Sequence, residues 1–406
     1  MRPVRLIAAV LFAGAAAACV TNVLQHRRQD ERARALDEQL KQFTARFHAR
    51  RFERPVLRGT AAEGNAADAE RALLEPLDKL DPKTFDPLTK LFRDGGPMPP
   101  AIVALVEQHR AALEALRAAS QRTHAWTQVP FEQGASAQIP PFVSRLRTNK
   151  LLLAMATRAD PADCMRIAAD AIRIGQDGGA GVGLIGSAIA AAQTELAIPV
   201  LLRCAARADT AARRDAAREV AVLAAHPLPL GDAFEAEGLM AGGSFRGLAL
   251  DVPAFPTSSA ALESWSGRGI ALDAWQHVAA EAEKLRGLDV RRVPEGLALL
   301  EQLEQAATRS PNPLVAMITP TRASLVIREA TAQTHLRATV VLLEALADPA
   351  ADPAGLVRKP ELADPFSGRP LAFRREPAGL VLCSVGPDGK SDDGKGDDVV
   401  TTLPKP

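Results

Sequence analysis

The stretch LIGSAIAAAQTELAIPVLL, residues 184–202, would place apolar side chains on almost every side of a helix. A helix that is apolar all round belongs in the centre of a protein. We therefore expect the most buried helix of the molecule here, with a kink at Pro199. Apolar residues at helical spacing continue on both sides of this stretch and predict an all-α body over residues 64–308.

The segment just before this helix, Gly181–Gly186, fits the pattern GxGxxG. A dinucleotide-binding loop needs a preceding strand and an acidic residue about twenty positions further on. Here the preceding residues 164–174 have helical periodicity, and position 206 is alanine. The pattern therefore predicts a helix–helix turn whose glycines allow close packing.

Region 227–270 differs from the rest of the body. It contains Pro227, Pro229, Pro253 and Pro256, together with a Gly-Gly pair at 242–243. This composition predicts an irregular insertion, and long irregular segments often carry a binding surface. We expect the insertion to contact a protein partner.

The N-terminus carries an uncharged run at residues 6–24, LIAAVLFAGAAAACVTNVL. At a rise of 1.5 Å per residue it just spans a bilayer core of about 30 Å. Arg2 and Arg5 precede it, which suits a cleaved signal peptide, a lipoprotein signal ending at Cys19, or an uncleaved anchor. We expect an anchor over residues 1–25, with the bulk of the chain outside the cytoplasm.

A membrane-proximal helix is predicted over residues 26–56. Leu36, Leu40, Phe43 and Phe47 form one apolar stripe on it. Because fewer than three heptads are present, this stripe favours packing against the protein's own body over a coiled-coil dimer.

The 406 residues include only four cysteines, Cys19, Cys164, Cys204 and Cys383. These are too few and too scattered for a disulfide scaffold or a zinc site. Cys164 and Cys204 lie on neighbouring predicted helices; a disulfide between them is one alternative, and two separate buried thiols are the expectation.

Composition excludes several classes of protein. The 49 basic and 48 acidic residues give a net charge of +1, and aromatic residues make up 4%. This balance excludes a strongly basic nucleic-acid binder, and the few aromatics argue against base-stacking platforms. The sequence also contains no GxSxG elbow, HExxH motif or Walker A loop. The motifs therefore predict no catalytic and no cofactor-binding residues.

The last ninety residues form a predicted α+β module, residues 313–406. A helix starts at Pro313 and extends to about Ala347, and six prolines between Pro349 and Pro377 then prevent regular helix. Short β-runs follow at 371–375, 380–385 and 399–403. They predict a small three-stranded antiparallel sheet.

A loop at residues 386–398 joins the last two of these strands. It holds five aspartates and four glycines. Ca²⁺ prefers six to eight oxygen ligands and accepts carboxylates together with backbone carbonyls. The D-x-D-x-D-G spacing of an EF-hand is absent, so composition alone is equally compatible with a solvated turn and a calcium loop.

The segment DPFSGRPLAFRREPAGLVLCSVGPDGKSDDGKGDD, residues 364–398, resembles the C-terminal region of the major pseudopilin of type II secretion systems. The matching positions are Asp364, Pro365, Gly368, Pro370, Ser384, Gly386, Asp388, Gly389, Asp397 and Asp398. The resemblance implies that this loop binds Ca²⁺. It makes Asp388, Asp397 and Asp398 the expected carboxylate ligands, with Ser384 or nearby carbonyl oxygens completing the shell and Asp392 or Asp393 as a supplementary carboxylate.

This resemblance is confined to the module, and the N-terminus lacks a prepilin peptidase site. It therefore implies a small fold and an ion loop rather than membership of a secretion pilus. The whole chain resembles bacterial membrane-anchored proteins in which an all-α region precedes the same tail, with Asn312-Pro313 at the helix start and an R-I-G…G-L-I-G pattern at 173–186.

We expect a mainly α protein with a single N-terminal membrane helix, held in the bacterial inner membrane with its bulk in the periplasm. The expected function is that of a non-enzymatic envelope scaffold with a calcium-stabilised C-terminal module and no nucleic-acid partner. Two alternatives stay open. One is an extracytoplasmic hydrolase using Asp232, Glu235 and Glu237 near His226; the other is a lipoprotein acylated at Cys19.

Overall fold

The computed structural model describes residues 2–74, 80–140, 142–249, 265–289, 293–318, 322–348, 350–376 and 379–404. The side chains of residues 2–20, 22, 265, 266, 317, 318 and 404 lie outside this description. The molecule is mainly helical with a small antiparallel sheet near the C-terminus, as predicted.

The elements up to residue 207 are α1 (Arg2–His48), β1 (Phe52–Glu53), β2 (Ala62–Asn65), α2 (Ala66–Leu74), η2 (Pro82–Phe85), α3 (Leu88–Asp94), α4 (Pro100–Ala119), β3 (Arg122–Ala125), η3 (Phe131–Ser136), α5 (Phe142–Ala156), α6 (Pro161–Gly179) and α7 (Leu184–Arg207). Those that follow are α8 (Thr210–Ala225), α9 (Leu230–Ala249), α10 (Trp265–Leu285), α11 (Val293–Thr308), α12 (Pro313–Ile318), α13 (Arg322–Ala347), α14 (Pro353–Leu356), η5 (Pro360–Leu362), β4 (Ala372–Glu376), β5 (Gly379–Ser384) and β6 (Val399–Pro404).

Four helices surround the main hydrophobic core. α7 packs against α6 and α13, and α8 packs against the same two helices. Leu201 of α7 and Val341 of α13 are fully buried there. The stretch 184–202 is thus a central helix, as predicted. Because α13 lies in this core, the all-α body and the C-terminal module share it.

The turn between α6 and α7 contains the GxGxxG pattern. Gly181 and Gly183 have φ values of 80° and 100°, which favour glycine. A Cβ atom on Gly186 would lie 3.0 Å from the carbonyl oxygen of Gly179 on the neighbouring helix. The prediction of a closely packed helix–helix turn is therefore confirmed.

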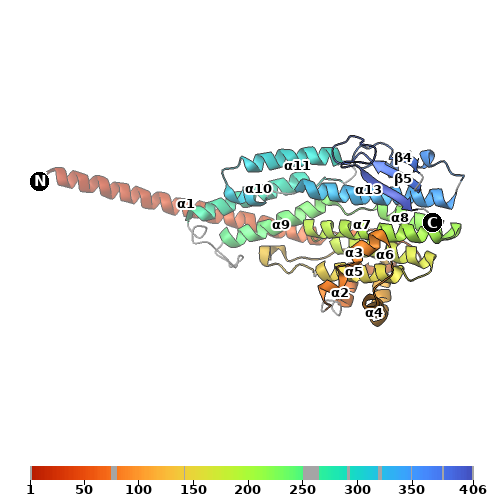
Figure 1. Cartoon of the computed structure of the whole chain (residues 1–406). Helices are drawn as coiled ribbons and strands as arrows, with labels where there is room; N and C mark the ends of the chain where they lie inside the picture. The colour runs from red at the N-terminus through yellow and green to blue at the C-terminus, as the bar shows by residue number, and fades with distance from the viewer. Residues whose placement is uncertain are drawn as a thin grey trace.

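α1 continues without interruption from Arg2 to His48, and its C-terminal half packs against α9 and α10. Leu36, Leu40 and Phe47 of its apolar stripe are buried, so the stripe does pack against the protein's own body. Figure 1 shows the N-terminal half of α1 extending away from the other helices, with the two termini at opposite ends of the molecule.

One described helix, α7, is long and apolar enough to cross a membrane, but 56% of its most apolar window is buried inside the protein. The predicted membrane segment, residues 6–24, forms part of α1. Most of its side chains lie outside the described residues, and the structure does not support the predicted membrane helix.

The structure corrects two predictions about the body. Region 227–270 was predicted to be irregular, but residues 230–249 form the regular helix α9 and α10 begins at Trp265. Residues 250–264 are outside the description. The glycines of α9 serve packing, since a Cβ atom on Gly243 would lie 1.9 Å from the carbonyl oxygen of Phe131. The body is also not entirely helical, because β1, β3 and β2 form a small sheet in that order.

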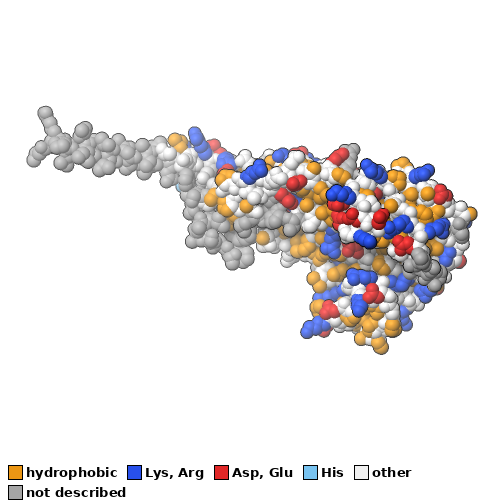
Figure 2. Space-filling view, turned by 45° about the horizontal axis from the view of Figure 1, so that its top comes forward, with side chains coloured by type: hydrophobic (Ala, Val, Ile, Leu, Met, Phe, Trp, Pro, Cys, Tyr) orange, Lys and Arg blue, Asp and Glu red, His pale blue; other side chains and the backbone are white. Residues whose placement is uncertain are grey.

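The C-terminal sheet has the order β4-β5-β6, with both pairs antiparallel, as predicted. Ala372 pairs with Cys383, and Ser384 pairs with Val399. β5 and β6 both lie against α13. The second pairing closes the 385–398 loop at its base. Figure 2 shows acidic and basic side chains interspersed on the visible face of the molecule, in keeping with the small net charge.

A disulfide joins Cys164 of α6 to Cys204 of α7, with their Cα atoms 6.1 Å apart. The expectation of two separate thiols is therefore wrong. Connectivity could not be read from the sequence, because it depends on how α6 and α7 pack. Cys383 is a free, buried thiol.

The segment that follows α1 is attached to the body by three arginines at a spacing of four residues. Arg50 pairs with Asp232 and Glu235, and Arg58 pairs with Asp170 and Glu219. Between them, Arg54 forms two hydrogen bonds of 2.8 and 2.6 Å to the carboxylate of Asp177. These two side chains are completely buried.

We expect Arg54→Ala to lower the free energy of unfolding by about 3–5 kcal/mol, because the Asp177 carboxylate would remain buried without a partner. Chemical denaturation of the purified chain measures this loss. Arg51→Ala, at an exposed neighbouring position, is the matched control and should change stability little. Equal losses for the two variants would contradict a special role for the buried pair.

The disulfide should stabilise the protein by about 2–4 kcal/mol, because it closes a 40-residue separation and restricts the unfolded chain. The double variant Cys164→Ser/Cys204→Ser should show this loss in denaturation curves. Reductant should destabilise the wild type but leave the double variant unchanged. A wild type insensitive to reductant would show that the bond contributes nothing.

Candidate metal centre

The loop between β5 and β6 folds back on itself. Gly386 has a φ of 65°, and a Cβ atom there would lie 2.2 Å from the carbonyl oxygen of Asp397. Only glycine therefore fits at this contact. Asp393 is a non-glycine residue with a φ of 56°, a conformation that aspartate tolerates better than most residues. The two halves of the loop are thus in direct backbone contact.

Three carboxylates meet in this folded loop. One oxygen from each of Asp388, Asp392 and Asp397 lies within 4.8 Å of the others, and all three residues are exposed. Three negative charges at this separation repel one another. A hard divalent cation such as Ca²⁺ would remove the repulsion and is typically bound by such oxygen ligands.

Asp398 has a different place in the loop. Its Oδ2 accepts hydrogen bonds from the backbone N–H groups of Asp392 at 2.9 Å and Gly394 at 2.7 Å. Its Oδ1 is buried and has no hydrogen-bond partner. Buried carboxylate oxygens are normally paired, so this oxygen is free to accept a further partner. The loop residues therefore fit a cation in both chemistry and placement.

Three of the six predicted ligands lie outside this group: Asp398, described above, together with Ser384 and Asp393. The buried Ser384 hydroxyl donates to Oδ1 of Asp364 at 2.7 Å and accepts from the Gly386 N–H at 3.2 Å. Asp393 contributes its carbonyl oxygen to Arg374 at 2.7 Å, and its carboxylate is outside the three-carboxylate group. The grouping of Asp388, Asp392 and Asp397 instead makes Asp392 a principal candidate rather than a supplementary one.

Asp364 is the residue whose role the sequence did not specify. Its buried carboxylate accepts hydrogen bonds from Phe366 N–H, Ser367 Oγ, Ser384 Oγ and Val385 N–H. It therefore ties the 364–370 turn to the start of the loop. One sequence feature could have indicated this role: Asp364 stands immediately before Pro365 in a turn-rich segment. Aspartate side chains in turns often accept a hydrogen bond from the backbone two residues further on.

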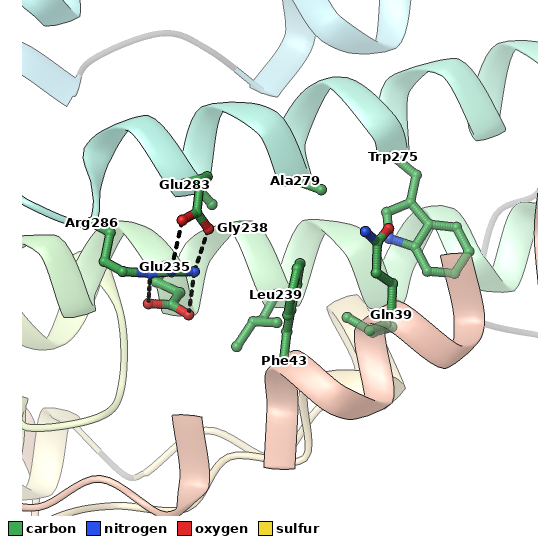
Figure 3. Close-up of a pocket in the computed structure, with 11 residues that line it drawn as sticks. Gln39, Phe43, Glu235, Gly238, Leu239, Trp275, Ala279, Glu283 and Arg286 are labelled. Atoms are coloured by element: carbon green, nitrogen blue, oxygen red, sulfur yellow. Dashed lines mark hydrogen bonds and ion pairs between the residues drawn. The ribbon is translucent and has the colours of Figure 1, made fainter. Parts of the chain in front are cut away.

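The carboxylates of the alternative hydrolase site lie elsewhere and face arginines. The Glu235 carboxylate accepts from Arg50 at 2.7 Å and from Arg286 at 3.2 Å. Figure 3 shows Arg286 directed at Glu235 and Glu283, in a pocket between α1, α9 and α10. This pocket has a volume of about 20 Å³, which is room for about one water molecule.

Asp232 shares Arg50 with Glu235, whereas Glu237 and His226 have other partners. Burial raises the pKa of Glu237, whose carboxylate is hydrogen-bonded to the backbone of Leu184. The His226 Nδ1 is 2.8 Å from the carbonyl oxygen of Val222, and the residue lines a different cleft of about 460 Å³. No described cavity is lined by all four residues.

Comparison of the chain with protein-family models, curated proteins and solved structures finds no match.

Proposed function

We propose that the protein is a non-enzymatic, membrane-anchored scaffold of the bacterial envelope whose C-terminal module is stabilised by Ca²⁺. The observation that carries the proposal is the convergence of Asp388, Asp392 and Asp397 in a closed loop between two strands. The resemblance of residues 364–398 to the calcium-binding region of the major pseudopilin supports the same ion.

In this proposal, Asp388, Asp392 and Asp397 hold the ion, and the free oxygen of Asp398 lies close in the chain as a further donor. The bound cation would neutralise the carboxylates and fix the loop that leads into β6. Since β6 lies against both α13 and α7, an ordered loop would stabilise the junction of the module with the body.

The membrane part of the proposal depends on residues 6–24, which contain no charged residue. The continuity of α1 supports a stiff connection between an anchor and the body. Buried contacts of α1 begin at Ala33, nine residues after Leu24, which corresponds to about 14 Å of helix. The body would therefore be held close to the inner membrane, on its periplasmic side. The Cys164–Cys204 disulfide supports that side.

No described cavity favours the hydrolase alternative, because Asp232 and Glu235 are paired with Arg50 and Arg286, and Glu237 is hydrogen-bonded to the backbone of Leu184. The lipoprotein alternative concerns Cys19, whose side chain is outside the described residues. Mass spectrometry of the mature N-terminus distinguishes acylated Cys19 from an intact anchor. The 227–270 region, with α9 in place of an irregular loop, remains the proposed surface for a protein partner.

Calcium should raise the melting temperature of the full chain by a few degrees relative to chelator. Binding to the folded state alone contributes about 2.7 kcal/mol when free calcium is one hundred times Kd. The double variant Asp392→Asn/Asp397→Asn should abolish the difference, because it removes two of the three converging charges while keeping side-chain size.

The matched control for this experiment is Asp393→Asn, which removes a charge from the same loop but outside the three-carboxylate group. It should retain the calcium response. Asp398→Ala is unsuitable as the principal variant, because Asp398 also accepts two backbone hydrogen bonds. Identical melting curves of the wild type in calcium and in chelator would refute calcium binding.

A fusion of alkaline phosphatase to the C-terminus should be active in a bacterial host, because the body would lie outside the cytoplasm, where this reporter folds. A fusion of a reporter that works only in the cytoplasm should be inactive. Deleting residues 6–24 should reverse the pattern. An inactive phosphatase fusion with an active cytoplasmic reporter would refute the proposed topology.

A further inference from the structure

A cleft of about 630 Å³ lies where the helical body meets the C-terminal sheet. It is bordered by α3, α7, α13 and β6. Its lining includes Glu195, Pro199, Arg203, His335, Val400 and Thr402. None of these residues belongs to the candidate metal centre or to the hydrolase alternative.

One stripe of α7 forms the floor. Glu195, Ile198, Pro199, Leu202 and Arg203 follow one another at alternating spacings of three and one and share one face of the helix. The stripe is apolar in the middle, acidic at one end and basic at the other. Glu195 and Arg203 are eight residues apart, which corresponds to about 12 Å along the axis.

The basic end has no ion pair at contact distance. Arg203 is half-buried, and among the described residues no carboxylate lies within 4.0 Å of its guanidinium; Asp94, which also lines the cleft, acts on Arg203 from a longer distance and opposes the effect of burial on its pKa. Its Nη1 donates to the carbonyl oxygen of Arg93 at 3.1 Å. Burial lowers the pKa of Arg203, and nearby Arg207 acts in the same direction. A guanidinium in this state favours a carboxylate, which can accept two parallel hydrogen bonds.

The acidic end offers two acceptors. The Glu195 carboxylate has Arg328 as an ion-pair partner only at the limiting distance of 4.0 Å, and both side chains are partly exposed. Pro199 has no N–H, so the carbonyl oxygen of Glu195, four residues earlier, has no partner in the helical ladder. A carboxylate and a carbonyl oxygen together suit an ammonium group, which has three donors and no acceptor.

The wall opposite α7 is the edge strand β6. It pairs with β5 on one side, and no other described strand pairs with it. Its residues Val400, Thr401 and Thr402 line the cleft and carry no charge. The other edge of the sheet, β4, carries Arg374, Arg375 and Glu376, and charges of this kind discourage strand addition. The edge at the cleft has no such protection, which favours an extended main chain beside it.

We propose that this cleft binds a short linear peptide with free termini, its ammonium group at Glu195 and its carboxylate at Arg203 and Arg93. An extended chain rises about 3.3–3.6 Å per residue, so a span of about 12 Å corresponds to three or four residues. The site is independent of the membrane anchor, and its ligand class differs from that of the candidate metal centre.

Titration calorimetry of the full chain with tetraalanine tests the proposal, at constant calcium concentration. Tetraalanine with free termini should bind saturably. Acetylation of its N-terminus or amidation of its C-terminus should each weaken binding about tenfold, the size of one charge-assisted interaction. A doubly capped peptide that binds as well as the free one, or no saturable binding of the free peptide at millimolar concentration, would overturn the proposal.

Two variants assign the ends. Glu195→Gln should weaken binding of free tetraalanine about tenfold and leave the N-acetylated peptide unaffected. Arg203→Gln should do the same for the free peptide and leave the C-amidated peptide unaffected. Arg214→Gln, an exposed position on α8 outside the cleft, is the matched control. If both variants weaken the binding of all peptides equally, the proposed orientation is wrong. If a variant does not fold, the affinities of the capped peptides for the wild type still decide the proposal.

Discussion

The fully buried ion pair between Arg54 and Asp177 is the constraint on which the arrangement of the chain depends. A buried carboxylate or guanidinium costs several kcal/mol of desolvation unless its partner is present with good geometry. This pair has that geometry, with two short hydrogen bonds and additional contacts from Arg54 to the carbonyl oxygens of Ser120 and Arg122. The segment after α1 can therefore occupy only one position relative to α6.

That fixed position explains how a long N-terminal helix becomes part of the body. Arg50 and Arg58 lie four residues to either side of Arg54 and form further ion pairs with the body. Arg50 pairs with carboxylates of α9, and Arg58 pairs with carboxylates of α6 and α8. The apolar stripe of α1 packs beside them against α9 and α10. If the N-terminal half of α1 is held in a membrane, the orientation of the body follows from this docking, because no flexible linker intervenes.

Carboxylates have contrasting surroundings in this protein. Asp364 and Asp177 are buried and satisfied by several donors, so they hold turns and helices together. Asp388, Asp392 and Asp397 are exposed and close to one another, with Lys390 only 4.0 Å from Asp388 as a compensating charge. Arg203 presents the converse case, a half-buried cation with no carboxylate in contact and Asp94 acting only from a longer distance. A ligand of opposite charge would gain the most binding free energy at these groups, because their charges have no close partner within the protein.

Local periods and turn signals in the sequence predict the helical class, the central helix at 184–202, the stripe of α1 and the three C-terminal strands. The sequence also located the aspartate loop. Tertiary structure alone decided which carboxylates meet: Asp392 joins Asp388 and Asp397, while Ser384 turns to Asp364. The same holds for the Cys164–Cys204 bond, the helical state of 230–249 and the three arginine attachments. These depend on contacts between residues distant in the sequence, and local periodicity carries no information about such contacts.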